Sequence, residues 1–161
     1  MILIVMGVAG SGKTTVGQLL AKELSWTFRD ADEFHPPTNI EKMGHGIALE
    51  DADRAPWLAA MRSAIEAWLK AGTNAVLTCS CLKAVYRQTL LIDPARIRFT
   101  YLKGSFDVID ARLRLRAHHF MKADLLKSQF AILEEPKEAV IVDLSEPPEV
   151  IVKKIREALK I

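Results

Sequence analysis

Short apolar runs recur along the chain, and the longer stretches between them carry apolar residues at helical spacing. Uninterrupted apolar runs of this length are typical of strands that are buried on both faces of a sheet. Their alternation with helical patterns favours an α/β fold, in which helices cover both faces of a parallel sheet. We predict strands at Ile2–Met6, Trp26–Arg29, Ala75–Thr78, Ile97–Leu102 and Ala139–Val142.

The helices are predicted from apolar stripes and from the residues that start and stop them. Pro56 is placed at a helix start, because proline is tolerated in the first turn, and Gly72 is placed near the end of the same helix. Residues 33–54 are predicted to be irregular, and residues 118–136 to be helical only in part. We predict helices from Lys13, from Pro56 to about Gly72, over Lys83–Leu91, from Ser105 to about Arg116, and after Pro148.

A glycine-rich turn joins the first strand to the first helix, and it fits the pattern G-x-x-x-x-G-K-[ST] at Gly7, Gly12, Lys13 and Thr14. Glycines let backbone N–H groups turn inward around phosphate oxygens, and the helix N-terminus adds a favourable dipole. Lys13 would reach the β- and γ-phosphates, and the Thr14 hydroxyl would bind Mg²⁺. The dinucleotide pattern G-x-G-x-x-G fails, because Thr15 stands at its last glycine. We expect the phosphates to contact Gly7, Ala9, Gly10, Ser11, Gly12, Lys13, Thr14 and Thr15.

Composition and net charge indicate an ordinary globular domain. The 161 residues suit one domain, with 50% apolar and 26% charged residues. A net charge of +2 with dispersed basic residues gives no reason to expect nucleic-acid or membrane binding. The opening apolar run is too short to span a bilayer and lacks a basic leader, so we expect a cytoplasmic protein.

The chain contains two cysteines, Cys79 and Cys81, at the end of the third apolar run. A disulfide between residues so close in sequence is geometrically unfavourable, and a cytoplasmic compartment would keep both thiols reduced. Together with His118 and His119 they match no usual spacing of zinc ligands. We therefore expect buried or site-lining thiols.

Polar residues gather where two of the predicted strands end, with Asp30 and Asp32 after the second strand and Ser80 and Lys83 after the third. Right-handed crossovers place the carboxyl ends of parallel strands and the phosphate loop along one edge of the sheet. Phosphoryl transfer needs an oxygen ligand near Mg²⁺ and a group that orients or deprotonates the attacking hydroxyl. The two aspartates suit these tasks, although a solvated acidic turn would also explain them.

Two further groups of charged residues have a functional and a structural interpretation. Arg54 could bind an anionic substrate through its planar fork, whereas Asp53 beside it could simply cap the next helix. Arg112 and Arg116 share a helix face and could approach a nucleotide, but cations near a helix end are favourable without any function. A basic segment that closes over the phosphates would shield the reaction from water.

Read together, these residues resemble the gluconate kinases of the small P-loop type, which are related in fold to shikimate and adenylate kinases. The resemblance covers nearly the whole chain in order, and its most specific parts are His35, Lys42-Met43, Asp53-Arg54 with Pro56-Trp57, and Ser80 with Leu82-Lys83. Three positions depart from the family pattern: Ala31 replaces a glycine, Ala48 a proline and Cys81 an alanine. None of these departures removes a charged group that the chemistry needs.

The resemblance implies a single P-loop domain over residues 1–161, a three-layer α/β/α fold with five parallel strands in the order 2-3-1-4-5, and a helical lid at about residues 117–136. It implies Mg²⁺-dependent transfer from ATP to the 6-hydroxyl of D-gluconate, in a homodimer. Asp30 would orient water around the metal, and Asp32 would accept or position the hydroxyl proton. Arg54, Ser80, Lys83 and His35 are implied substrate contacts, and Arg112 or Arg116 would neutralise the transferring phosphoryl group.

Two rival functions stay open at this point. One is another small-molecule kinase of the same fold, with shikimate or a nucleoside monophosphate as acceptor. The other is a non-catalytic nucleotide-binding module, which would need neither the two carboxylates nor a basic lid.

Overall fold

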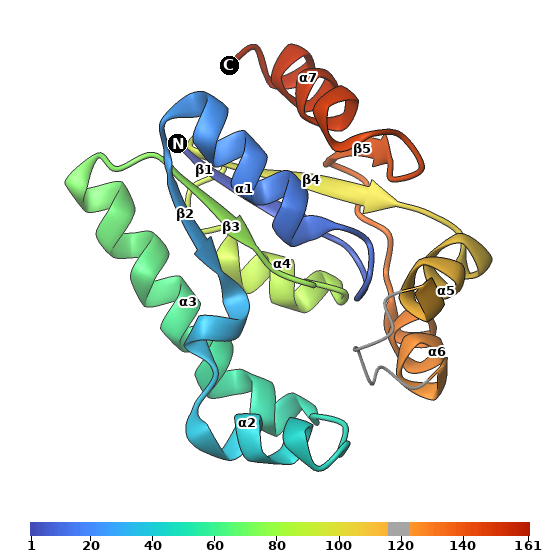
Figure 1. Cartoon of the computed structure of the whole chain (residues 1–161). Coiled ribbons are helices and arrows are strands. Elements are labelled where there is room, and N and C mark those ends of the chain that lie inside the picture. The colour runs from blue at the N-terminus through green and yellow to red at the C-terminus, as the bar shows by residue number, and fades with distance from the viewer. Residues whose placement is uncertain (116–122) are drawn as a thin grey trace.

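A computed structural model describes residues 1–115 and 123–161, and its centre is a parallel sheet of five strands (Figure 1). Every strand pair is parallel, and the spatial order β2-β3-β1-β4-β5 confirms the predicted one. β1 and β3 have the predicted bounds, and the other three differ from the prediction by one residue at one or both ends. The strands are β1 (Ile2–Met6), β2 (Thr27–Asp30), β3 (Ala75–Thr78), β4 (Ile97–Lys103) and β5 (Val140–Asp143).

Helices cover both faces of this sheet, as the continuous apolar strands predicted. On one face, α1 (Lys13–Leu24) and α7 (Pro148–Leu159) pack on Leu3 and Val5 of β1. On the other face, α3 (Asp51–Ala71) and α4 (Ala84–Leu90) pack on Ile2, Ile4 and Met6. Since successive side chains of a strand point to opposite faces, β1 contributes to both cores and is fully buried. The strand that carries the phosphate loop is therefore held from both sides.

Two helices, α5 (Phe106–Leu115) and α6 (Ala123–Ile132), lie together beyond the carboxyl end of β4 (Figure 1). The rings of Phe106 and Phe130 meet edge to face with centroids 5.7 Å apart, which joins the two helices. The prediction that residues 118–136 are helical in part is confirmed by α6. Arg116, His118 and His119 lie outside the described residues.

The prediction of an irregular stretch over residues 33–54 is wrong in part. A short 3₁₀ helix, η1 (Ala31–Phe34), is followed by the helix α2 (Pro37–Gly44). α2 begins with a proline at a helix start, where the missing N–H costs nothing. Its one buried residue is Asn39, so it has no apolar stripe by which periodicity could reveal it.

The start of α3 was also predicted wrongly, because the helix begins at Asp51 and includes Pro56. The Oδ2 of Asp53 accepts a hydrogen bond from the backbone N–H of Glu50 at 2.9 Å, which caps the helix one turn earlier than expected. Pro56 falls within the second turn and is accommodated there. As a result, Arg54 lies in the first turn of α3 and not in a preceding loop.

Within the described part of the chain, none of the helices has the length and apolar character that a bilayer crossing requires.

Candidate active site

β1 and α1 are joined by the predicted phosphate loop, residues 7–12, in which all three glycines have positive φ angles. Gly10 and Gly12 have φ angles of 76° and 89°, a region that other residues rarely adopt. A Cβ at Gly10 would also lie 2.8 Å from side-chain atoms of Leu113 on α5. A Cβ at Gly12 would meet no atom within 4 Å, so the space in front of the N-terminus of α1 is open. The loop thus forms a concave turn around the start of a helix, which favours binding of an anion.

The polar atoms around this loop fit a phosphate group and a magnesium ion. The hydroxyl Oγ of Ser11 is buried and has no hydrogen-bond partner among the described residues. The Nζ of Lys13 donates to the carbonyl oxygen of Val8 at 2.9 Å, and so folds back across the loop. The Oγ1 of Thr14 donates to Asp30 Oδ2 at 3.2 Å, which brings together two oxygen ligands of the kind that Mg²⁺ prefers.

No group of three His, Cys, Asp or Glu side chains in residues 1–115 and 123–161 could hold a metal ion alone. A site with few protein ligands suits Mg²⁺, which is commonly held by one or two protein oxygens together with substrate phosphates and water. Desolvation in the loop lowers the pKa of Lys13, whereas the negative charges of Asp32 and Asp30 act to raise it. A phosphate would supply the negative charge that favours the ammonium form.

Asp30 ends β2 and is held from several directions. Its Oδ2 accepts hydrogen bonds from Thr14 and from Thr78 Oγ1, the latter at 2.8 Å. Its Oδ1 accepts one from the backbone N–H of Asp32 at 3.0 Å. Thr78 lies opposite Asp30 in the register of β2 and β3, which explains the contact. Asp30 is therefore fixed beside the helix start, as a ligand to metal-bound water has to be.

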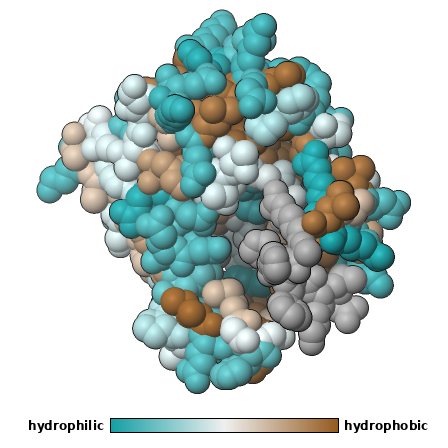
Figure 2. Space-filling view, viewed as in Figure 1, coloured by the Kyte–Doolittle hydropathy of each residue, from teal (hydrophilic) through white to brown (hydrophobic). Residues whose placement is uncertain are grey.

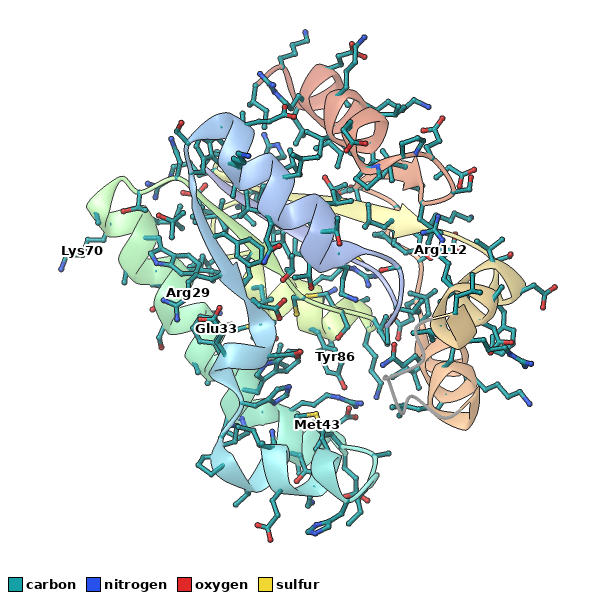
Figure 3. All side chains as sticks on the ribbon, viewed as in Figure 1. Arg29, Glu33, Met43, Lys70, Tyr86 and Arg112 are labelled. Atoms are coloured by element: carbon teal, nitrogen blue, oxygen red, sulfur yellow. The ribbon has the colours of Figure 1, made fainter. Side chains whose placement is uncertain are left out.

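The turn that carries both aspartates is braced on each side. Arg29 and Glu33 form an ion pair at 2.7 Å, visible at the end of β2 in Figure 3, and Glu33 Oε1 accepts from the backbone N–H of Asp30 at 3.0 Å. The indole Nε1 of Trp57 donates to the carbonyl oxygen of Ala31 at 2.7 Å. These bonds fix the backbone between the two aspartates, so the second carboxylate leaves the turn in a defined direction.

Asp32, in contrast to Asp30, has a side chain that is 88% exposed. The pKa of its carboxyl is raised, first because neighbouring protein atoms displace part of its water and second because Asp30 repels a second negative charge. His35 and Lys13 act in the opposite direction. Because water reaches most of the side chain, the desolvation contribution is weaker than full burial would give, and we ascribe the direction mainly to Asp30. The two carboxylates thus differ, one bound and one accessible.

His35 lies beside Asp32 and is almost fully covered. Its side chain is 6% exposed, and its Nε2 lies 4.0 Å from Asp32 Oδ1. The ring stacks on the indole of Trp57, with centroids 4.7 Å apart and an angle of 6° between the planes. Burial lowers the pKa of His35, the charge of Arg54 lowers it further, and Asp32 raises it. His35 is therefore influenced by the accessible carboxylate and also by Arg54, which belongs to the next group of charges.

That group is a cationic cluster at the start of α3 and α4, made of Arg54, Lys83 and Tyr86 around the carboxylate of Asp51. Lys83 Nζ lies 2.9 Å from both carboxylate oxygens, and Arg54 Nη1 lies 3.7 Å from Oδ1. Arg54 Nη1 also donates to Tyr86 Oη at 3.1 Å, and Tyr86 Oη donates to Asp51. Ser80, predicted as a further contact, is half-buried and makes no side-chain hydrogen bond within the described residues. The cluster already binds one carboxylate.

Figure 2 shows that the molecule is hollowed between α2, at the bottom of the view, and the body of the protein, and that hydrophilic residues border the hollow. α2 is attached to α3 by polar contacts. Lys42 Nζ pairs with Asp53 Oδ1 at 2.7 Å, and Asn39 Nδ2 donates to the carbonyl oxygen of Asp53, also at 2.7 Å. Asp53 therefore has two structural roles: it caps α3 from the third helical position, with Glu50 at the N-cap, and it anchors α2 through Lys42.

The predicted lid residues are only partly in place around the loop. Figure 3 shows Arg112 on α5 directed toward the turn after β5, where its Nη2 donates to the carbonyl oxygen of Leu144 at 2.6 Å. In this conformation Arg112 supports that turn and does not meet the phosphate loop. On α6, Gln129 Oε1 accepts from the backbone N–H of Ala9 at 2.7 Å, so one donor of the loop is occupied by a lid residue.

The three departures from the family pattern are accommodated. Ala31 is 2% exposed and packs in the core under α3, so its extra methyl fills space there. Ala48 is exposed. Cys81 is buried with a φ angle of 45°, and its carbonyl oxygen accepts from Arg87 Nη1 at 2.8 Å. Both cysteines are buried, as predicted, and burial raises the pKa of Cys79.

Sequence reasoning missed several residues that make up the site. Asp51 and Tyr86 complete the cationic cluster, Thr78 holds Asp30, Asn39 bonds His35, and Gln129 occupies the phosphate loop. Thr78 could have been found, since it ends the strand next to β2. The others depend on contacts between elements far apart in sequence, for which a single sequence carries no signal.

Comparison with known proteins identifies the family of this chain. The family model described as shikimate kinase matches residues 9–160. A gluconokinase of Gluconobacter oxydans (strain 621H) is 51% identical over 134 residues, which are 83% of this chain and 75% of that protein. The thermoresistant gluconokinase of Escherichia coli (strain K12) is 41% identical, over 99% of this chain and 93% of its own. This chain belongs to the gluconokinase family.

The crystal structure of a gluconokinase from Sinorhizobium meliloti 1021 agrees with this assignment. It superimposes with a TM-score of 0.89 at 40% identity, covering 98% of this chain and 90% of that chain. The resemblance noted in the sequence is thus confirmed at the level of the family. The rival of a shikimate or nucleoside monophosphate kinase is not favoured.

Proposed function

We propose that this protein transfers the γ-phosphoryl group of ATP to the 6-hydroxyl of D-gluconate, giving 6-phospho-D-gluconate and ADP. Membership of the gluconokinase family supports the proposal. The observation that carries it is the convergence of Arg54 and Lys83 on a single carboxylate, in the same part of the molecule as the accessible Asp32 beside His35. A sugar acid has a carboxylate at one end and the reacting hydroxyl at the other. A cationic cluster and an exposed carboxylate are complementary to those two ends.

The nucleotide would be bound by residues 7–15, with the backbone N–H groups of the loop, Ser11 Oγ and Lys13 around the phosphates. Lys13 would exchange its bond to the Val8 carbonyl oxygen for a phosphate oxygen. Thr14 would bind Mg²⁺ directly, and Asp30 would hold a water molecule of its shell. When bound, Mg²⁺ neutralises the charge of the transferred group.

Asp32 would accept the proton of the 6-hydroxyl, or hold that hydroxyl in line with the phosphoryl group. Arg54 and Lys83 would bind the carboxylate of the sugar acid, with Ser80 and His35 as further contacts. Asp51 competes for the same two cations, so the substrate has to replace or share this partner. Either Arg112 or Arg116 would contact the phosphoryl group. Arg112 would first have to release its bond to the Leu144 carbonyl oxygen.

A coupled assay of ADP formation tests this function. We expect ATP turnover to depend on D-gluconate, and the product to carry phosphate at its 6-position by ³¹P and ¹³C NMR. The uncharged alcohol glucitol should be a poor acceptor, because it offers Arg54 and Lys83 no carboxylate to replace that of Asp51. Shikimate and a nucleoside monophosphate are anionic but should also be poor acceptors, because neither has a carboxylate and a primary hydroxyl at the two ends of an open carbon chain. Equal turnover of glucitol and gluconate would exclude the proposed placement of charge. ATP binding without turnover of any acceptor would favour a nucleotide-binding module.

We further propose that residues 1–161 act as one domain whose lid spans about residues 117–136, and that the protein is a cytoplasmic homodimer, as the family resemblance implies. Light scattering of the purified protein measures the oligomeric state directly. A single particle of the mass of one 18.0 kDa chain would exclude the dimer.

A further inference from the structure

A buried asparagine outside the predicted site has an orientation that its surroundings fix. Asn39 on α2 is 2% exposed. Its Nδ2 donates to the carbonyl oxygen of Asp53 at 2.7 Å and lies 3.3 Å from Nδ1 of His35. If the amide were turned over, its Oδ1 would face the Asp53 carbonyl oxygen, and two acceptors would be in contact without a proton between them. The amide nitrogen therefore faces both groups.

This orientation determines the protonation of His35. One Nδ2 hydrogen of Asn39 is used by the Asp53 carbonyl oxygen, and the second points at His35 Nδ1. Nδ1 must then be an acceptor, which places the ring proton of neutral His35 on Nε2. A doubly protonated ring would bring an N–H group against the N–H of Asn39. Asn39 thus favours one neutral tautomer over both alternatives.

The protonated nitrogen faces Asp32. The Nε2 of His35 lies 4.0 Å from Asp32 Oδ1, while the ring is held by its stack on Trp57. Trp57 is itself fixed by its bond to the Ala31 carbonyl oxygen, in the turn that carries Asp32. At 4.0 Å the N–H acts as a dipole beside the carboxylate, and a small rotation of the exposed Asp32 side chain would bring it into hydrogen-bond reach. The positive charge of Arg54 acts on His35 as well, and it also disfavours a second ring proton.

We propose that Asn39 is a positioning residue, which selects the Nε2–H tautomer of His35 so that this N–H orients the carboxylate of Asp32 toward the acceptor hydroxyl. His35 is then a donor in the site and cannot be its base. The role of Asp32 in this scheme rests on the proposed function, whereas the tautomer of His35 does not. The two parts can therefore be tested separately.

The tautomer is measured by ¹⁵N NMR of the histidine rings, in which protonated and unprotonated nitrogens have well-separated shifts. The chain has four histidines, and the spectrum of His35→Gln assigns the signal. We expect the Nε2–H form in the wild type and a mixture of both neutral forms in Asn39→Ala. In Asn39→Asp a carboxylate faces Nδ1, so we expect a proton on that nitrogen. A wild-type ring protonated on Nδ1 would overturn the inference whatever the protein phosphorylates.

The kinetic test compares two substitutions of His35 that lose the ring equally. The amide of His35→Gln reaches the position of Nε2, whereas that of His35→Asn reaches only the position of Nδ1. We expect His35→Gln to keep several-fold more kcat for gluconate than His35→Asn, at similar melting temperatures. Equal kcat values would show that the Nε2–H group is not used.

A second kinetic comparison uses Asn39 itself. We expect Asn39→Ala to lose roughly 10-fold in kcat, a size typical of residues that orient a functional group. Asn39→Asp should lose more, although it keeps more of the packing, and the KM for ATP should change little in both. If Asn39→Ala is the worse variant, Asn39 contributes packing alone and the proposal fails. Should Asn39→Asp not fold, the two His35 variants decide. A wild type with the expected tautomer but no gluconate turnover would exclude the proposed function and leave the tautomer assignment standing.

Discussion

The two halves of the candidate site are held in different ways, although both lie at the same edge of the sheet. The phosphate half consists of β1, residues 7–12 and α1. It stands on a strand whose five residues are fully buried, between two apolar cores. The acceptor half consists of η1, α2 and the first turns of α3 and α4. In it, α2 has one buried residue, Asn39, and exposes Ile40 and Met43, and the segment after α2 exposes Ile47.

This difference indicates which parts of the site can adapt. The backbone of the phosphate loop is preorganised by packing, although Gln129 and the Val8 carbonyl oxygen occupy two of its donors, which a nucleotide would have to release. α2 is held by polar contacts such as the ion pair of Lys42 with Asp53, and such contacts can rearrange at little cost in exposed positions. We therefore expect substitutions in the phosphate half to act on the chemical step, and those in the acceptor half to act mainly on substrate binding or local stability. Asp32, which belongs to the acceptor half but is proposed to act on the reacting hydroxyl, should be the exception.

The largest effect is expected for Asp32→Asn. An amide cannot accept the hydroxyl proton, and general-base catalysis commonly contributes about 10²- to 10⁴-fold, so we expect kcat to fall by about 10³-fold. ATP binding, measured by calorimetry, should be retained. Glu41→Gln is the matched control, since it removes an exposed acid from the neighbouring helix α2. A turnover of Asp32→Asn similar to that of the control would remove Asp32 from the mechanism.

Lys13→Ala should be almost as damaging, by a different route. Loss of one preorganised charged donor typically costs about 10²- to 10³-fold in kcat. The melting temperature should change little, because Lys13 donates only to a loop carbonyl oxygen and adds little to the apolar core. Lys22→Ala, at the exposed end of the same helix, controls for the loss of a lysine. Near-normal turnover of folded Lys13→Ala would contradict the assignment of the phosphate half.

Arg54→Ala should affect the acceptor and not the nucleotide. A hydrogen bond to a charged group contributes about 1.5–3 kcal/mol, so the KM for gluconate should rise by roughly 10- to 100-fold. The KM for ATP should stay within a factor of about two if the halves are independent. Arg54→Lys keeps the charge without the planar fork and should be intermediate. Equal increases in both KM values would mean that the two halves are coupled more tightly than their packing indicates.

The same contrast explains what could be predicted from the sequence. The fold and the phosphate loop follow from local patterns: buried apolar runs, helical stripes and a fixed motif around Lys13. Asp30 and Asp32 follow from their position after a strand. In each case the signal lies within a few residues of the group it concerns.

The acceptor half has no such signal. α2 was missed because a helix held by polar contacts has no apolar periodicity, and the start of α3 because Pro56 suggested a later boundary. The contacts of Asn39 with His35 and of Tyr86 with Asp51 join residues whose proximity depends on the packing of whole elements. Propensity and spacing carry no information on such pairs. The resemblance to gluconate kinases marked several of these positions but gave no geometry for them.

The smallest expected effect concerns the pH dependence of the acceptor half. Asp53 accepts a hydrogen bond from Lys42, which holds the pKa of its carboxyl below the ordinary value of 3.8. The hydrogen bond from the backbone N–H of Glu50 lowers this pKa further. A carboxyl whose pKa is depressed in the folded state stabilises that state at pH values above 3.8, and this stabilisation is lost as the pH falls through the depressed value. Asp53→Asn has no proton to bind there. Its melting temperature should be slightly lower than that of the wild type at neutral pH, and the difference should shrink in acid.

Lys154→Ala, which breaks an ion pair with Glu146 on the opposite side of the sheet, serves as the control. Hydrogen exchange of the α2 amides locates the change when each rate is compared with the intrinsic rate at the same pH. We expect α2 of the wild type to be less protected in acid, and α2 of Asp53→Asn to be less protected already at neutral pH. If the melting temperatures of wild type and Asp53→Asn fall in parallel with pH, the bond between Lys42 and Asp53 does not hold α2 in solution.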